Sequence, residues 1–376
     1  MNNMVSLGEV LAYEQPTKYI VEDTTYDNSF ETPVLTAGQS FILGYTDEKE
    51  NIYTNLPCII FDDFTTAKKY VDFPFKVKSS AMKILTNDEK KSDIKYVFLK
   101  MSTINIDTTL HKRYWISTYS HIKIPLPPLP TQRKIAAVLD KVSDLIAERK
   151  KQIEQLDLLV KARFTEMFGD LNQSEFQYST LLDIISDSKN SLKRGPFGGS
   201  LKKDDFVENG FLVYEQRHAI HNDFKYEKYY ITNEKHEEMK GFSVKPGDLI
   251  VSCSGTLGRI AEIPSYAKPG IINQALLKIK LNNEVVNNIF FITLFKDKYM
   301  QGKLFGVSRG SGISNFPSMP EIKSIKFPLP PLPLQTQFAE FVQGVERARE
   351  EARQGLKQLE VLYSALIQEY FGEEKQ

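Results

Sequence analysis

One stretch of 47 residues occurs twice in this chain. Residues 124–170 align without a gap to residues 327–373, and the two copies carry the same residue at 17 of 47 positions. Average residue usage would give roughly three matches by chance. The chain is therefore built by internal duplication, and its fold has to contain the duplicated element twice.

Each copy begins with the tract PLPPLP, at residues 125–130 and 328–333. Proline fixes φ and removes a backbone donor, so we expect this tract to be extended and a helix to start just after it. Proline-rich tracts are often ligands for aromatic grooves on other proteins, and that alternative stays open. Because both tracts directly precede a helix, we favour a rigid spacer.

The residues after each tract show one long helical pattern. No Pro or Gly occurs from Thr131 to Phe168, and apolar residues recur there at intervals of three and four, which predicts a helix of about 38 residues. The second copy keeps a seven-residue apolar spacing. Both helices are predicted to end in a left-handed glycine cap, at Gly169 and Gly372. The predicted helix-pairing residues are Ile135, Val142, Leu156, Leu159, Phe338, Val345, Leu359 and Leu362.

A helix of this length with a single apolar stripe needs a partner of equal length. The other copy is the obvious partner, and the alternative is that each helix packs only on its neighbouring domain. Antiparallel pairing would relate the two halves by a pseudo-twofold axis and would place the domains at opposite ends of a fixed spacer.

The predicted organisation has four parts: a domain at 1–123, the first tract and helix at 124–170, a second domain at 171–326, and the second tract and helix at 327–376. Both domains contain short β-rich runs between turn residues, which is typical of mixed α/β (α+β) domains. The first domain has 14 basic and 16 acidic residues, a net charge of −2, and the second has 21 and 17, a net charge of +4. Similar helices thus connect dissimilar domains.

Composition limits the possible functions. Lys plus Arg and Asp plus Glu number 48 each, so no bulk charge favours nucleic acid or an acidic membrane, and such a partner needs local evidence. Cys58 and Cys253 are the only cysteines, so we expect reduced structural thiols. The chain has no signal peptide and no apolar run of membrane-spanning length, which predicts a cytoplasmic protein with no membrane partner.

The sequence lacks the common catalytic and cofactor motifs. It has no GxxxxGK(S/T) loop, no GxGxxG, no HExxH, no GxSxG, no (D/N)PP(Y/F) of amino-methyltransferases and no clear nuclease cluster. Its five histidines have no ligand spacing with carboxylates or cysteines. We therefore expect no catalytic residue, no metal site and no cofactor in this chain.

Loops rich in Gly and Ser beside basic residues are the remaining candidates for a binding site. Glycine lets backbone amides approach a phosphate, Arg forks onto guanine or phosphate, and Asn pairs with adenine. Each loop could equally be an ordinary surface turn, and Trp115 is expected in the core. The candidate DNA-binding residues are Thr65, Thr66, Lys68, Lys69, Lys112, Arg113, Lys193, Arg194, Gly199, Ser200, Lys202, Lys203, Arg217, Ser254, Gly255, Thr256, Arg259, Arg309, Ser311, Ser314 and Asn315.

The order of variable domain, PLPPLP helix, second variable domain and second PLPPLP helix resembles the specificity subunit of type I restriction-modification enzymes. The similarity spans nearly the whole chain. Its most specific elements are IPLPPLPTQRKIAAVLDKVSDLI and its repeat, the endings MFGD and YFGE, RGPFGGSLKKDDFVENG in the second domain, and GSGISNF before the final helix.

The resemblance implies that the two domains are target recognition domains, each reading one half of a bipartite, asymmetric site in double-stranded DNA. The helices would form an antiparallel coiled coil that sets the gap between the half-sites. The subunit would be non-catalytic and would dock two modification (methyltransferase) subunits and the restriction/translocase subunits. Adenine-N6 methylation with S-adenosylmethionine, and DNA cleavage with ATP and Mg, would belong to those partners. The alternatives are a coiled-coil adaptor without a DNA role and the specificity module of a fused restriction-methyltransferase.

Overall fold

The chain folds into two compact units. The computed structural model describes residues 3–36, 38, 40–109, 112–197, 199–306 and 316–372. Unit 1 comprises residues 1–152 and 352–376, and unit 2 comprises residues 153–351. Each unit therefore contains one domain together with parts of both long helices. The four-part division of the chain stays a prediction.

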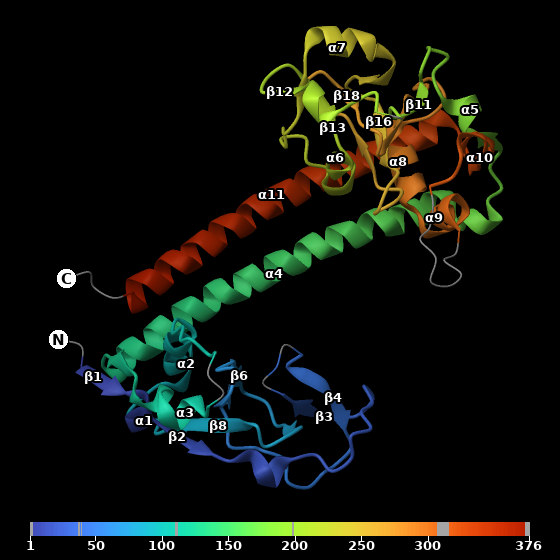
Figure 1. Ribbon diagram of the computed structural model, residues 1–376. Coiled ribbons are helices and arrows are strands. Elements are labelled where there is room, and N and C mark those ends of the chain that lie inside the picture. The colour runs from blue at the N-terminus through green and yellow to red at the C-terminus, as the bar shows by residue number, and fades with distance from the viewer. Residues whose placement is uncertain are drawn as a thin grey trace. The chain divides into compact units, whose positions relative to one another are not determined.

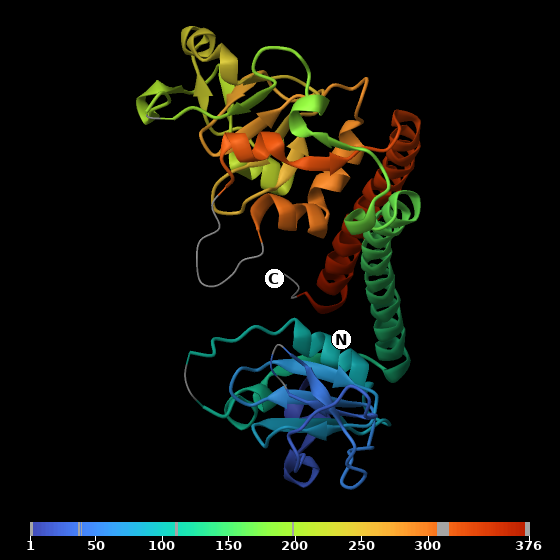
Figure 2. The same cartoon turned by 90° about the vertical axis from the view of Figure 1, so that its right-hand side faces the viewer.

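Unit 1 contains two sheets of more than two strands and one antiparallel two-stranded sheet, which pairs Asn3–Ser6 with Lys123–Leu126. Its elements are β1 (Asn3–Ser6), α1 (Leu7–Val10), β2 (Leu11–Glu14), β3 (Thr32–Leu35), β4 (Ile42–Thr46), β5 (Cys58–Asp62), β6 (Lys68–Val71), β7 (Lys76–Val77), β8 (Met82–Asn87), α2 (Ile94–Ser102), α3 (Tyr114–Ser117) and β9 (Lys123–Leu126). A four-stranded antiparallel sheet has the order β2-β8-β5-β6, and a three-stranded sheet has the order β4-β3-β7. α2 covers the first of these sheets, which is drawn in blue in Figure 2, and shares an apolar core with it.

Unit 2 also contains two sheets of more than two strands and one antiparallel two-stranded sheet, which pairs Tyr178–Thr180 with Lys326–Pro328. Its elements are β10 (Tyr178–Thr180), α5 (Leu181–Ile184), β11 (Leu192–Arg194), β12 (Phe206–Val207), β13 (Phe211–Tyr214), α6 (Gln216–His221), β14 (Tyr230–Ile231), α7 (Asn233–Glu238), β15 (Ser243–Val244), β16 (Leu249–Ser252), β17 (Ile260–Glu262), β18 (Gly270–Ile272), β19 (Leu276–Ile279), α8 (Asn288–Lys296), α9 (Lys298–Phe305), α10 (Met319–Ser324) and β20 (Lys326–Pro328). The sheet orders are β11-β19-β16-β17 and β12-β14-β13-β18-β15. α8 lies beside β16 (Figure 1), and their apolar residues form one core.

The two units repeat one framework. Each has a four-stranded antiparallel sheet in which the second strand of the domain, β2 or β11, lies at one edge and a hairpin at the other. Each also has a second sheet with a parallel pair, β3 with β7 and β13 with β18. A short helix with a capping box follows the first strand in both, at Ser6 and Glu9 in unit 1 and at Thr180 and Asp183 in unit 2. The mixed α/β (α+β) fold with an internal repeat is confirmed, and the repeat extends from the helices into the domains.

The long helices begin inside the proline tracts. α4 (Leu129–Phe168) and α11 (Leu332–Phe371) are each 40 residues long. The start just after the tract was therefore wrong, because Pro130 and Pro333 occupy the first helical turn, where a backbone N–H would have no helical partner. The first part of each tract is extended, in β9 and β20, as predicted.

A buried glutamine holds the start of each long helix. Gln132 donates from Nε2 to the carbonyl of Pro127 at 2.7 Å and accepts the backbone N–H of Asp93 at 2.9 Å. Gln335 repeats both bonds in unit 2, at 2.7 Å to its own proline tract and at 2.9 Å from the N–H of Asn287. Both side chains are at most 1% exposed. Each long helix is thus tied to the N-terminus of the helix that covers its domain's sheet.

The helices pair antiparallel within each unit. In unit 2 the ring of Phe338 lies 5.4 Å from those of Phe164 and Phe168. Eleven residues further along α11, Arg349 pairs with Asp157 at 2.9 Å, which lies earlier in α4. In unit 1 the last turn of α11, at Phe371, shares a core with the early α4 residues Ala136 and Leu139, whereas Gly355 of α11 lies against the later α4 residue Arg149. The predicted antiparallel pairing of the two helices is confirmed.

The inward positions of both helices follow an unbroken heptad pattern with alternating steps of four and three. In α4 they are Ile135, Leu139, Val142, Ile146, Arg149, Ile153, Leu156, Val160, Arg163 and Met167, and in α11 they are Phe338, Val342, Val345, Arg349, Ala352, Leu356, Leu359, Tyr363, Leu366 and Tyr370; all are buried or half-buried. Six of the eight predicted helix-pairing residues lie in this seam. Leu159 and Leu362 do not, because the pattern steps four residues at that point, to Val160 and Tyr363. Both leucines are 46% exposed, so the prediction for these two was wrong.

The two long helices end differently. Gly169 has a φ of +70°, which confirms the predicted left-handed cap of α4. Gly372 does not adopt a positive φ, so the matching prediction for α11 was wrong. Its N–H instead continues the helical pattern by donating to the carbonyl of Gln368 at 2.9 Å. Within the described residues, no helix has the length and apolar character needed to span a bilayer.

Candidate nucleic-acid interface

Two of the predicted loops leave the same edge of the four-stranded sheet of unit 2. β11 and β16 both pair antiparallel with β19, so they run in the same direction. Arg194, the last residue of β11, is paired with Leu277, which is paired with Val251 near the end of β16. The segments that follow Arg194 and Ser252 therefore leave the sheet at the same end, with one strand, β19, between them. We call this edge the unit 2 reading edge.

The turn between β16 and β17 is held from within and exposed at its tip. The hydroxyl of Ser252 donates to the carbonyl of Thr256 at 2.5 Å and accepts the N–H of Arg259 at 2.9 Å. Gly255 and Gly258 have φ values of +60° and +70°, which favour glycine. A side chain at Gly258 would also meet the ring of Phe305 at 2.2 Å. The predicted residues in this turn, which are Ser254, Gly255, Thr256 and Arg259, are all exposed.

Arg194 is held between two aromatic rings. The centre of its guanidinium lies 5.2 Å from the ring centroid of Phe197 and 5.4 Å from that of Phe316. Its Nε atom is buried and has no hydrogen-bond partner among the described residues. Phe197 is 63% exposed although it is a large apolar residue. Neither phenylalanine was among the predicted site residues; the aromatic residue inside a Gly-rich basic loop was the available signal.

The rest of this basic loop lies on the surface. Gly199 has a φ of +78°, and the hydroxyl of the exposed Ser200 donates to the carbonyl of Phe197 at 2.8 Å. Lys202 and Lys203 are exposed. Lys193 is half-buried, with its ammonium 5.1 Å from the ring centroid of Phe242.

Arg217 lies on α6 and already has partners in the protein. Its guanidinium centre is 4.4 Å from the ring centroid of Tyr226, and its Nη2 is 3.9 Å from Asp223. The four remaining candidates of the second domain, Arg309, Ser311, Ser314 and Asn315, lie outside the described residues.

Unit 1 has its predicted threonines at the corresponding place, in the turn from β5 to β6. Asp62 caps this turn by accepting the N–H groups of Phe64 and Thr65 at 2.8 Å each. Thr66 adopts a φ of +59°. Two turns predicted independently from the sequence thus occupy the same hairpin position in the two copies of the framework. We call the end of the unit 1 sheet that carries the β5–β6 turn the unit 1 reading edge.

A buried carboxylate joins this turn to the second predicted cluster of unit 1. Asp63 lies 3.2 Å from the ammonium of Lys83, and their side chains are only 5% and 2% exposed. Asp63 also accepts the N–H of Trp115 through its side chain and that of Tyr114 through its carbonyl, each at 2.8 Å. The segment holding Arg113, which is exposed, is thereby fixed beside the turn. Trp115 is in the core, as predicted.

The lysines of unit 1 are less available than the sequence indicated. Lys68 points inward and donates to the hydroxyl of Tyr119 at 2.7 Å. Burial lowers the pKa of Lys68 to about 8 and raises the pKa of Tyr119 to about 12. Lys69 lies over the ring of Phe41 at 5.7 Å, and Lys112 donates to the hydroxyl of Thr118 at 3.0 Å. The prediction that Lys68 contacts DNA is not supported, because its ammonium faces the core.

Both cysteines and two of the histidines have structural surroundings. Burial raises the pKa of the Cys58 and Cys253 thiols to about 12, and both cysteines are free. His218 is fully buried, with Nε2 at 2.9 Å from the carbonyl of Tyr226, and His236 stacks on Phe211 at 3.8 Å. Across the ranges that the structure describes, no group of three His, Cys, Asp or Glu side chains could hold a metal ion.

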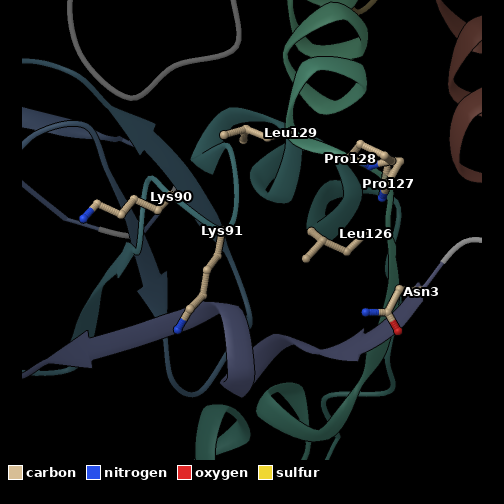
Figure 3. A pocket seen from close by; sticks show the side chains of 7 residues that line it. All are labelled: Asn3, Lys90, Lys91, Leu126, Pro127, Pro128 and Leu129. Atoms are coloured by element: carbon tan, nitrogen blue, oxygen red, sulfur yellow. The ribbon is translucent and has the colours of Figure 1, made fainter.

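An open pocket of about 390 Å³ lies where the first proline tract meets the domain of unit 1. Asn3, Lys90, Lys91 and residues 126–129 line it, and Figure 3 shows Leu126 in the view between Lys91 and Asn3. None of the predicted DNA-binding residues lines this pocket.

Comparison with known proteins identifies the class to which this chain belongs. A family model for the type I restriction modification DNA specificity domain matches residues 2–156 and again residues 196–361. The chain belongs to this family, as its resemblance indicated.

Individual relatives narrow the class further. The specificity subunit of the type I restriction enzyme EcoR124I/EcoR124II of Escherichia coli is 41% identical over 228 residues, which cover 55% of this chain and 52% of that protein. The MjaVIII specificity subunit of Methanocaldococcus jannaschii is 25% identical over 253 residues, covering 64% and 59%. The matched regions thus span little more than half the length of these relatives.

Solved structures share the fold at low sequence identity. The S subunit of a type I restriction-modification system from M. genitalium superposes with a TM-score of 0.65 at 16% identity, covering 99% of this chain and 96% of that one. A chain from a structure on complex assembly and conformational transition of the type I system gives a TM-score of 0.57 at 14% identity, covering 98% and 97%.

Proposed function

We propose that this chain is the DNA sequence-specificity subunit of a type I restriction-modification enzyme. Each unit reads one half of a bipartite, asymmetric site in double-stranded DNA. The observation that carries the proposal is the repeated framework, in which both units present a hairpin turn at the same sheet edge while the side chains on the two turns differ. Family membership over both halves supports the assignment to DNA.

Within this proposal the chain is non-catalytic, and the chemistry belongs to its partners. Two modification subunits would methylate adenine N6 with S-adenosylmethionine, and restriction/translocase subunits would use ATP and Mg. Both cysteines are buried, and burial raises the pKa of their thiols to about 12, which disfavours the thiolate form that acts as a nucleophile. The cytoplasmic location expected from the sequence remains a prediction.

The long helices offer a surface for these partners. Leu145, Leu158, Leu159, Val361 and Leu362 are large apolar side chains on α4 and α11 that are between 40% and 63% exposed. The contacts of Arg149 with Gly355 and of Lys150 with Glu360 bring Leu145 level with Val361 and Leu362 within unit 1. Clusters of exposed apolar residues mark protein interaction sites, so we assign the modification subunits to these helices.

The half-site gap is assigned to the helices as well. α4 and α11 have no break in their helical hydrogen-bonding pattern over 40 residues each, and the heptad seam continues through both. A change of whole heptads in both helices preserves the seam, whereas other changes rotate it out of register. We therefore expect paired heptad insertions to change the gap and to leave the half-sites as they are.

The test is copurification with a methyltransferase subunit followed by selection of bound sequences from randomised DNA. Wild-type complex is expected to select two conserved half-sites with a fixed gap. Replacing residues 171–326 with the corresponding domain of a relative should change one half-site and preserve the other. Selection of no sequence would refute the proposal and favour a protein adaptor, and a change in both half-sites would refute the assignment of one half-site to each unit.

A further inference from the structure

Arg194 is the cation at the unit 2 reading edge whose guanidinium lies between two aromatic rings. It is the last residue of β11, so its backbone is fixed by the sheet. Its guanidinium lies between Phe197 and Phe316, at 5.2 Å and 5.4 Å from the two ring centroids. Among the described residues its side chain has no ion pair and no hydrogen bond. Both rings therefore position the guanidinium and leave its hydrogen-bonding capacity unused.

The neighbouring backbone is packed so closely that this position cannot shift easily. A Cβ at Gly195 would lie 1.8 Å from the carbonyl oxygen of Asn273, and the N–H of Gly195 donates to the carbonyl of Leu276 at 2.8 Å. Across β19 lies β16, which ends at Ser252 and is followed by the exposed tip of the hairpin turn. The charge of Arg194 also acts on Cys253, the residue that follows this strand. Burial raises the pKa of the Cys253 thiol, and the positive charge of Arg194 partly opposes that rise.

A guanidinium fixed in this way is suited to reading a base. Its planar fork can donate two parallel hydrogen bonds to O6 and N7 of guanine, which is the commonest specific arginine contact in the major groove. The rings reduce the side-chain entropy that such a contact would cost. Contacts to phosphate have less need of order, and the exposed Lys202 and Lys203 on the same loop can supply them.

We propose that Arg194 is a specificity-determining residue that recognises one guanine in the half-site read by unit 2, and that Phe197 positions it. This assignment rests on the proposed function and adds the base and the residues that read it. Arg194→Lys keeps the charge but loses the planar fork. Phe197→Leu keeps an apolar cover but loses the aromatic face.

The experiment compares the DNA preferences of the intact complex with its methyltransferase partner. Wild type, Arg194→Lys, Arg194→Ala and Phe197→Leu are each equilibrated with a library in which every position of the selected site is varied. Lys268→Ala is the matched control, because it removes a positive charge that also lies over an aromatic ring, that of Tyr230, but is paired with Glu227 and is not a candidate DNA-binding residue. We expect Arg194→Lys and Arg194→Ala to reduce the preference for a single G·C pair by on the order of 10- to 100-fold.

The two proposed roles predict different patterns. Phe197→Leu should weaken the same preference by less, and Lys268→Ala should leave it unchanged. A uniform loss of affinity for all sequences in both Arg194 variants, with a shallower salt dependence, would show a phosphate contact and overturn the proposal. An unchanged profile in a folded Arg194→Lys complex would overturn it too. A wild-type complex without any sequence preference would instead refute the proposed function, and this assignment with it.

Discussion

The two units place a hairpin turn at the same point of the same framework, but they hold it differently. In unit 1 the turn is tied down by Asp63, which pairs with the buried Lys83, and the following lysine, Lys68, faces inward. In unit 2 the hydroxyl of Ser252 holds the turn, and Arg259 is exposed. The bonds that hold each turn come from its base, so the exposed tip is free to differ. A duplicated fold can thus carry two different reading surfaces.

Below the reading edges the two units are far more alike. Gln132 and Gln335 make the same pair of hydrogen bonds, and the aromatic residue at the end of each long helix packs on the helix that covers the sheet, Phe371 on Tyr96 and Phe168 on Phe290. Around the long helices, matching positions of the two units can carry side chains of different size, as Ile135 and Phe338 do. Mutations at matched positions can therefore show how far the likeness of the two units extends.

The largest difference is expected at the first seam position of each helix. Phe338 is fully buried against Phe164 and Phe168, whereas the matching residue Ile135 is half-buried. Phe338→Ala should reduce the free energy of unfolding of unit 2 by about 3–5 kcal/mol, and Ile135→Ala should cost unit 1 about 1–2 kcal/mol. Hydrogen exchange measured on peptides from each unit separates the two effects. Equal losses would contradict the difference in burial.

The glutamines should behave alike. Gln132→Ala and Gln335→Ala each leave a backbone N–H and a carbonyl without their partner, which should cost about 1–3 kcal/mol in the unit concerned. Gln155→Ala, at an exposed position of α4, is the control and should change stability by less than about 0.5 kcal/mol. If only one of the two substitutions lowered the free energy of unfolding, the matching hydrogen bonds would contribute unequally to the stability of the two units.

A pH effect is expected in unit 1. The pKa of Lys68 is about 8 in the folded protein and about 10.5 in the unfolded chain, so the unfolded state binds more protons between these values. Burying the charged lysine costs stability below pH 8, and this cost is relieved as the pH rises from about 8 towards 10.5. The raised pKa values of the Cys58 thiol and of Tyr119 act in the opposite direction, from about pH 9 for the thiol and from about pH 10 for Tyr119.

Unit 1 should therefore become more stable between about pH 8 and pH 9, by on the order of 1 kcal/mol after solvent screening. Lys68→Met should abolish this rise, and Lys69→Met, on the same strand, should retain it. Hydrogen exchange, corrected for the intrinsic rate at each pH, measures the difference. A rise that persists in Lys68→Met would show that another group titrates.

The smallest expected effect concerns a helical glycine. Gly344 lies in α11, and a Cβ there would meet no atom closer than 4.0 Å. Gly344→Ala should therefore stabilise unit 2 by about 0.5–1 kcal/mol. Gly169→Ala is the contrasting variant and should destabilise, by about 1–2 kcal/mol, because alanine is strained at a φ of +70°. A destabilised Gly344→Ala variant would show that α11 needs flexibility at this point.

The features that were predictable from the sequence are those with a local period. The lengths of the long helices and their seam follow from apolar residues at three- and four-residue spacing, whereas their antiparallel direction was implied by the family resemblance. The errors have local causes as well. Proline is tolerated in a first helical turn, which moved both helix starts into the proline tracts. Leu159 and Leu362 each precede the true seam residue, Val160 or Tyr363, by one position. The prediction took a step of three from Leu156 and Leu359 where the seam takes a step of four, and both steps are compatible with one face of a helix.

The candidate site divides in the same way. Gly- and Ser-rich turns beside basic residues were visible in the sequence, and two of them proved to be matching hairpin turns. That Lys68 faces the core, while Arg194 is held between two rings, depends on Tyr119 and Phe316, which lie 51 and 122 residues away from them. No local pattern links residues at such separations.

By itself the sequence determined that the chain is duplicated, that its two copies share a long helix behind a proline tract, and that the domains between them differ. These properties follow from periodicity and from residue identity at aligned positions. The tertiary structure alone decided which residues meet at a sheet edge, because strand pairing is non-local: the antiparallel pairing of β11 and β16 with β19 brings Arg194 beside the β16–β17 turn. Burial then determines which of the charged side chains at these edges remain free to bind a partner.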